Sequence, residues 1–126
     1  MTKLQAIKSF LSGFGLKAYH ENYIYAPDVA LPLPYITYSV QFDNYRGGSR
    51  PLTVTAWYRT NDPQPLEEFE NIVAERVGIS GTVIPCDGGY ILIKRGTPFG
   101  QFLDVPADKF VKRVIINLLA EYNTAI

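Results

Sequence analysis

Histidine, cysteine and an excess of either charge are what this chain has least of. Its 126 residues include one histidine, His20, and one cysteine, Cys86, and its 12 Lys and Arg balance its 12 Asp and Glu. Because a single cysteine cannot form an internal disulfide, we expect folding in an intracellular compartment. The balanced charge gives no general reason for wrapping nucleic acid or binding an anionic membrane.

Long hydrophobic runs are missing as well. No apolar stretch approaches the ~20 residues of a membrane span. Residues 1–15 carry Lys3 and Lys8 without a long apolar segment, so we expect no signal peptide. The hydrophobic content of 47% lies in the globular range, and the length suits one domain, 1–126. Nine Tyr and seven Phe favour a sheet.

Residues for common catalytic and metal sites are few. A histidine-based triad would have to use His20, and the sequence has neither a Gly-x-Ser-x-Gly elbow nor a Walker loop. The counts exclude metal sites with two His or several Cys. Carboxylates alone would have to come from Asp87, Asp104 and Asp108, which are typical turn residues. We interpret Cys86 as a buried structural thiol and expect no enzyme, cofactor or metal.

The most regular pattern lies in residues 31–59. Apolar and polar residues alternate on both sides of a polar connection, residues 43–51. A period of two, with β-branched and aromatic residues, predicts two half-buried strands. One apolar and one polar face are typical of an antiparallel sheet with one side on a core. We therefore predict a long central hairpin.

The connection of this hairpin holds candidate interaction residues. Gly47 and Gly48 can adopt positive φ at low cost, and Arg46 and Arg50 flank them. We predict a projecting, basic tip. Arginine side chains and backbone N–H groups could contact phosphate there, or the tip could simply be a soluble turn.

Two segments have helical spacing. The first follows Thr2 as N-cap and places Leu4, Ile7, Phe10, Leu11 and Phe14 on one stripe. The second begins with Asp62 as N-cap and Pro63 at the first helical position, and it ends at Gly78. Its apolar stripe consists of Leu66, Phe69, Ile72, Val73 and Val77. Both stripes predict helices packed on the sheet, and hence an α+β fold.

The remaining segments predict further strands and one loop. Residues 16–26 suit an edge strand, and residues 81–86 and 89–95 flank an Asp-Gly-Gly turn that indicates a hairpin. Residues 95–108 are rich in Gly and Pro yet apolar, so we expect a flexible loop. Residues 109–122 fit a helix or a strand, and their Val-Ile-Ile-Asn run favours a long strand.

Aromatic residues of the expected loop are the second set of interaction candidates. Phe99 and Phe102, with Gln101 between them, must either fold onto the body or meet a partner. In the second case a neighbouring copy could bury the aromatic rings.

Several segments together resemble a known family. They are Leu33-Pro34-Tyr35-Ile36, Ala56-Trp57-Tyr58, Asn61-Asp62-Pro63, Lys112-Arg113-Val114-Ile115 and Glu121-Tyr122-Asn123. In this order, around a hairpin and after an N-terminal helix, they are similar to tail terminator proteins of long-tailed phages and prophages. These are also called tail completion or head–tail joining proteins.

The resemblance implies a tail-terminator-like fold, with an antiparallel sheet and two packed helices, that closes into a homo-oligomeric ring, a hexamer. Such a ring caps the tail tube protein, faces the head–tail connector protein and lets DNA pass. The protein would be a structural, non-enzymatic virion component assembled in the host cytoplasm, with no catalytic residues to carry over. Contacts are expected at the residues named above, namely Arg46, Gly47, Gly48, Arg50, Phe99, Gln101 and Phe102.

Two alternatives stay open. One is another head–tail connector or neck component, which has similar size and class. The other differs in kind and is a small ligand-binding domain or enzyme that uses His20 and nearby tyrosines. A deep pocket lined by His20 would favour it.

Overall fold

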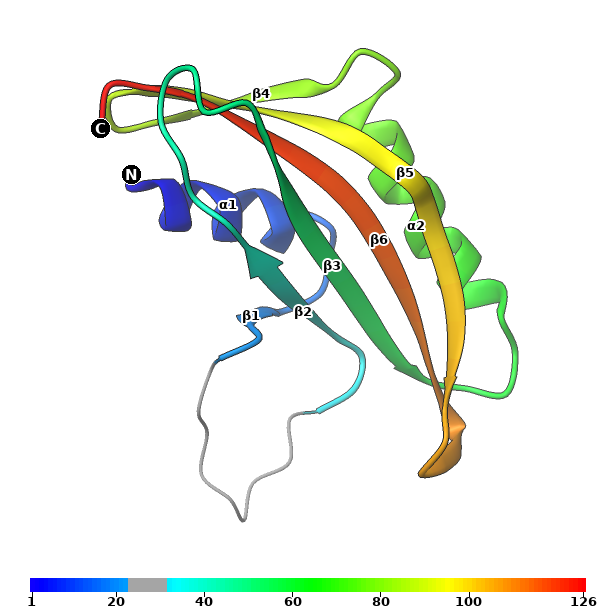
Figure 1. The fold of residues 1–126 in the computed structure, drawn as a ribbon. Coiled ribbons are helices and arrows are strands. Elements are labelled where there is room, and N and C mark those ends of the chain that lie inside the picture. The colour runs from blue at the N-terminus through cyan, green and yellow to red at the C-terminus, as the bar shows by residue number, and fades with distance from the viewer. Residues whose placement is uncertain (23–31) are drawn as a thin grey trace.

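The structure is a computed structural model that describes residues 1–22 and 32–126. Within these residues two helices accompany one six-stranded sheet of order β1-β2-β3-β6-β5-β4 (Figure 1). In chain order the elements are α1 (Lys3–Ser12), β1 (Ala18–His20), β2 (Tyr35–Val40), β3 (Ser49–Arg59), α2 (Gln64–Val77), β4 (Thr82–Cys86), β5 (Gly89–Val105) and β6 (Asp108–Thr124). The α+β class expected from the sequence is confirmed.

The sheet is mixed rather than fully antiparallel. Four of its five pairings are antiparallel, but β1 runs parallel to β2, with Ala18 opposite Ile36. Alternation along a strand reports which face is buried and not which way its neighbour runs, so the sequence pattern could not distinguish the two. β1 does lie at an edge, as predicted, although it is shorter than 16–26. Residues 23–26 of that prediction fall outside the described residues.

The predicted hairpin of residues 31–59 is formed by β2 and β3, with Tyr38 opposite Val54. A longer hairpin, β5–β6, has 17 residues in each strand. The prediction of a flexible loop at 95–108 is therefore wrong. Gly96, Pro98 and Gly100 only interrupt the pairing as a bulge, after which β5 rejoins β6 and continues to Val105. Residues 109–122 are strand, as their composition favours.

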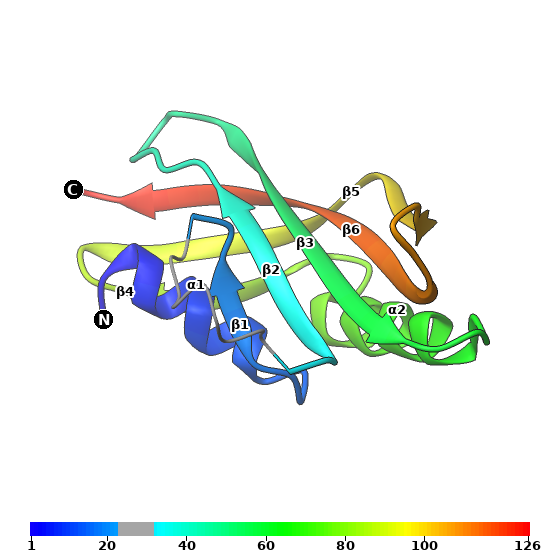
Figure 2. The same cartoon turned by 90° about the horizontal axis from the view of Figure 1, so that it is seen from below.

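Both helices lie on one face of the curled sheet (Figure 2). α1 lies towards the end with the two termini, and α2 towards the turn between β5 and β6 (Figures 1 and 2). Thr2 and Gln5 form a capping box at the start of α1. α2 begins at Gln64, one residue later than predicted, yet the Asp62 carboxylate still accepts the Gln64 N–H at 3.0 Å.

The core forms between the helices and this face of the sheet. Alternate residues of β6 enter it, and both helices contribute to the same cluster. Ile72 of α2 was predicted in the buried stripe but is 46% exposed, because it lies towards one side of the helix. The largest fully buried side chains are Tyr122, Phe69, Ile7, Leu11, Ile36, Leu52, Leu66, Ile91, Ile93, Ile116, Leu118 and Val54.

Alternation along β6 gives a direct test of this core. Ile116 is fully buried, whereas its neighbour Ile115 is half-buried on the face without helices. We expect Ile116→Ala to lower the free energy of unfolding by about 2–5 kcal/mol, because it leaves a cavity. The matched Ile115→Ala should cost roughly 1 kcal/mol or less. Urea titration of both variants measures the difference, and equal losses would contradict the assigned faces.

Candidate interaction sites

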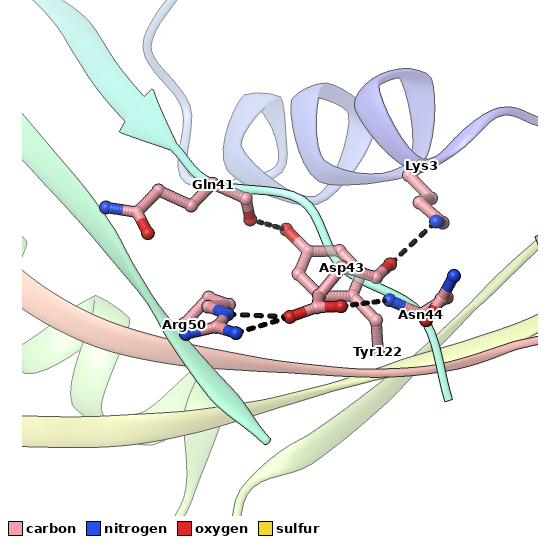
Figure 3. A network of polar contacts seen from close by, with 6 residues as sticks. All are labelled: Lys3, Gln41, Asp43, Asn44, Arg50 and Tyr122. Carbon is pink, nitrogen blue, oxygen red and sulfur yellow. Dashed lines mark hydrogen bonds and ion pairs between the residues drawn. The ribbon is translucent and has the colours of Figure 1, made fainter. Parts of the chain in front are cut away.

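The connection between β2 and β3 is held by a polar network centred on Asp43 (Figure 3). The carboxylate of Asp43 accepts from Arg50 Nε at 2.7 Å and Nη2 at 2.6 Å, and from the Asn44 N–H at 2.8 Å. Lys3 Nζ of α1 donates to the Asp43 carbonyl oxygen at 2.7 Å. The network therefore ties the connection both to β3 and to the helix.

These contacts alter the properties of the connection. The Asn44 N–H, and then Arg50, hold the pKa of Asp43 below its usual range, so the carboxylate is ionised at neutral pH. A Cβ at Gly47 would collide with the same carboxylate, so glycine is required for a close approach. Arg50 is thus an internal partner, and the prediction that it projects from the tip is wrong.

Arg46 is the arginine of this connection that remains exposed. It has a φ of 72°, which is uncommon for a residue with a side chain, and its guanidinium lies 5.5 Å from the ring of Tyr45. Gly48 also has positive φ, at 78°. Arg46 therefore presents a positive charge next to an aromatic ring that is 63% exposed.

The same connection is bonded to the C-terminal end of β6. The Tyr122 hydroxyl donates to the Gln41 carbonyl oxygen at 2.6 Å (Figure 3), and the Tyr45 N–H donates to the Thr124 carbonyl oxygen at 2.9 Å. Burial raises the pKa of Tyr122, so its hydroxyl keeps the proton that it donates. Lys3 Nζ lies 5.6 Å from the centre of the same ring. The loop is therefore anchored at several points.

A hollow of about 420 Å³ opens beside this anchored connection. It is mostly apolar, its lining includes Thr2 and Ile126 from near the two chain ends, and the Met1 ammonium pairs with Asp87 of the β4–β5 turn at 3.0 Å. Its lining residues are Thr2, Lys3, Leu4, Phe42, Asp87 and Ile126. Leu4, Phe42 and Ile126 are 40%, 48% and 67% exposed. We call this region the α1 end. Met1 and Tyr45, which are 64% and 63% exposed, lie near its lining residues in the sequence.

A second hollow, of about 340 Å³, lies at the opposite end of the sheet. It forms between the start of α2 and the β5–β6 hairpin, and Phe102 at its wall is 43% exposed. Phe110, 49% exposed, follows on β6. Its lining residues are Asn61, Pro63, Leu66, Phe102, Leu103, Asp104 and Lys112. We call this region, with Phe110, the α2 end.

The structure therefore separates the residues that the sequence grouped as one set of contacts. Phe99 does fold onto the body and packs against the core, with the Arg95 guanidinium 5.5 Å from its ring. Gln101 lies opposite Ile115, on the face without helices, and only Phe102 belongs to the α2 end. Arg46, Gly47, Gly48 and Arg50 lie on or beside the connection near the α1 end.

The sequence did not predict three of the exposed apolar residues, Phe42, Ile126 and Phe110. The alternating pattern assigned Phe42 to the buried face, and its exposure follows only because β2 ends at Val40. Phe110 fitted the apolar stripe of the helix considered for 109–122. Its exposure of 49% depends on tertiary packing, which a local pattern does not contain.

The face of the sheet without helices carries a row of stacked side chains. Tyr35 stacks on Trp57 at 6.2 Å between ring centres, and the Arg113 guanidinium lies 5.3 Å from the Trp57 ring. Trp57 Nε1 also donates to Thr37 Oγ1 at 2.9 Å. The same face also carries polar Ser39, Thr53, Thr55, Gln101 and Asn117 and half-buried Ile115 and Leu119.

His20 and Cys86 are not combined into a reactive site by the described residues. His20 Nδ1 accepts the Asn22 N–H at 3.1 Å, its ring packs on Tyr38, and it lines neither hollow. Cys86 is half-buried rather than buried, and desolvation raises the pKa of its thiol.

The carboxylates considered for a metal lie apart from one another and have other partners. Asp87 pairs with the Met1 ammonium, Asp104 with Lys112 Nζ at 2.8 Å, and Asp108 with Arg59 Nη1 at 3.2 Å. Over residues 1–22 and 32–126 no three side chains of His, Cys, Asp or Glu gather as a metal site would need.

The lowered pKa of Asp43 predicts a pH-dependent stability. A carboxylate with a lowered folded-state pKa stabilises fully above its unfolded-state pKa of about 4, and this stabilisation is lost as pH falls through the folded-state value. We therefore expect Asp43→Asn to be less stable than the wild type at pH 7, with the gap closing below about pH 4. Urea midpoints across pH 3–7 measure it, with Asp104→Asn as control. A gap independent of pH would contradict the assignment.

The hydrogen bond of Tyr122 predicts a second effect. Tyr122→Phe leaves the Gln41 carbonyl without this donor and should lower the free energy of unfolding by about 1–2 kcal/mol. Tyr45→Phe is the matched control, since the Tyr45 ring is 63% exposed, and it should change nothing measurable. Faster amide exchange of Asn44 and Tyr45 in Tyr122→Phe would show that the connection has loosened. Equal stabilities of the two variants would exclude an anchoring role.

Comparisons with known proteins do not assign a role to these surfaces. No protein-family model matches the chain, and no curated protein and no solved structure is significantly similar to it. Neither α1 nor α2, the helices of the described residues, has the length and apolar character needed to cross a membrane. The geometry of the two ends is therefore the main guide to function.

Proposed function

We propose that this chain is a structural assembly protein of the tail-terminator type, which works as a ring of identical copies. One observation supports the proposal above all. Large apolar side chains are exposed at two unlike ends of one sheet, and no described residue of the same chain covers them. Exposed apolar clusters of this kind are typical of surfaces that bind another protein.

The two ends differ in composition, and this difference bears on the type of assembly. A contact between unlike surfaces repeats from copy to copy, and it closes into a ring when the rotation between copies permits. The two paired strands β5 and β6 extend between the ends, so each copy offers both surfaces at a fixed separation (Figure 1). In a closed ring every copy has both of its surfaces covered by a neighbour. The resemblance to tail terminators implies six copies.

The remaining features suit such a ring at the junction of phage head and tail. The ring would cap the tail tube protein on one side and meet the head–tail connector protein on the other. With 12 basic and 12 acidic residues, its surface has no net charge to hold DNA that passes through. The role needs no chemistry, which fits a lone His20 that lines neither hollow. The protein would therefore be a non-enzymatic component of the virion.

Solution mass and electron microscopy test the proposal. We expect the purified protein, alone or with polymerised tail tube protein from the same genome, to form rings of one size that cap tube ends. A ring that binds the connector but not the tube would instead identify a neck component. Persistent monomers with neither partner bound would contradict the proposal.

Removing exposed aromatic surface should abolish this assembly without unfolding the chain. We expect Phe102→Ser with Phe110→Ser to lower ring formation at least tenfold, because both rings are half exposed and available to a neighbour. Ile79→Ser is the matched control, since Ile79 is 95% exposed but belongs to neither end. Circular dichroism should show unchanged folding in both. If the control and the double variant assemble alike, the α2 end is not a contact.

A further inference from the structure

Charge is divided between the two helices although the chain as a whole is neutral. α1 contains Lys3 and Lys8 and no acidic residue. α2 contains four glutamates and one arginine. The arginine, Arg76, lies in the last turn of α2 and donates to the Gly13 carbonyl oxygen. The four glutamates are Glu67, Glu68, Glu70 and Glu75. Because the helices lie towards opposite ends of the sheet, the molecule has a basic end and an acidic end (Figure 2).

The α1 end keeps unneutralised positive charge around its hollow. Lys8 lies one helical turn beyond Leu4 and is exposed, and Arg46 is exposed on the neighbouring connection. The two acidic residues nearby are already neutralised, Asp43 by Arg50 and Asp87 by the Met1 ammonium. An approaching surface therefore meets an apolar hollow with a basic rim.

The α2 end has the opposite rim. Glu67 follows Leu66, which lines the hollow, and Glu70 lies against Gly100 of β5 on the same side. Neither glutamate forms an ion pair with a described residue, whereas Lys112, in the wall, is paired with Asp104. Phe102 and Phe110 add exposed apolar area, with Lys109 Nζ 5.3 Å from the Phe110 ring. This end is apolar, and its rim is acidic along α2, while Lys109 adds one positive charge on the side of the β5–β6 hairpin.

We propose that the α2 end of one copy docks on the α1 end of the next, as the repeated contact of the ring. Phe102 and Phe110 then cover the hollow lined by Leu4, Phe42 and Ile126, and Glu67 and Glu70 face Lys8 and Arg46. The partner is a second copy of this chain because both complementary surfaces occur once in every copy. This inference rests on the proposed ring and adds which surfaces meet.

Charges at the rim of a contact set its orientation and its salt dependence more than its total strength. The arrangement therefore disfavours contact of two α1 ends or of two α2 ends, since each would bring like charges together. Assembly should weaken as ionic strength rises, because salt screens exposed charges over about 10 Å at 0.1 M.

Charge reversal gives the test. Lys8→Glu puts a negative charge on the basic rim of the α1 end, and Glu67→Lys puts a positive charge on the acidic rim of the α2 end. Each variant alone should assemble at least tenfold more weakly than the wild type in sedimentation velocity at low salt. A 1:1 mixture should recover assembly, with the two variants alternating, because one contact then has both native charges and the next has both charges reversed. The double variant Lys8→Glu/Glu67→Lys should also recover.

Matched controls separate this contact from a general effect of charge. Lys17→Glu and Glu75→Lys make the same changes at exposed positions away from the two hollows, and they should assemble as the wild type does. Because Glu67 lies in the first turn of α2, thermal unfolding must show that Glu67→Lys still folds.

Cross-linking reads the contact directly even when association is weak. A carbodiimide that joins amines to carboxylates, applied to mixed isotope-labelled and unlabelled chains, should link Lys8 to Glu67 or Glu70 across copies. Assembly that ignores both reversals, or cross-links between copies at other positions only, would overturn the assigned contact and leave the ring intact. Wild-type chains that show neither assembly nor cross-links between copies, with or without tube protein, would overturn both the contact and the ring.

Discussion

Alternation along β6 is the constraint on which the rest of the structure depends. Its inward side chains, from Val114 to Tyr122, contact both helices' core cluster, while its backbone pairs with β3 on one side and β5 on the other. A shift of one residue would move every one of these side chains to the opposite face, so the hydrophobic pattern fixes the register of three strands at once. The positions of both ends of the sheet follow from that register.

The Asp43 network extends this order into a loop. Without it, a connection of this length would lose backbone entropy on ordering without much buried apolar area to compensate. The paired carboxylate, the Tyr122 hydroxyl and the Lys3 ammonium instead fasten it to three elements. The loop that was predicted to project is therefore held against the body of the protein. Phe42 stays at a defined place in the lining of the hollow beside α1. A surface that is already ordered loses less conformational entropy on binding a partner than a mobile loop does.

The sequence predicted what depends on local periodicity and could not predict what depends on distant packing. Strand alternation in β2, β3 and β6, the cap at Thr2 and the stop at Gly78 are local and are confirmed. The parallel pairing of β1 with β2 and the continuation of β5 beyond Arg95 depend on which strand each segment pairs with, and the pattern of one segment does not contain that information. The same distinction applies to the sites. The sequence suggested that Arg50 is a free charge. Its ion pair with Asp43 depends on the conformation of the connection, which the sequence pattern does not give.

Neutral composition takes on a different meaning once charge is placed in space. Read as a total, equal numbers of acidic and basic residues give no general reason for attraction to DNA or to an anionic surface. Read along the structure, the same residues form a molecule with a basic helix at one end and an acidic helix at the other. A chain without net charge but with unlike ends can attract copies of itself in one orientation, and it has no net charge that would attract a uniformly charged polymer. Both properties suit the proposed ring, through which DNA would pass.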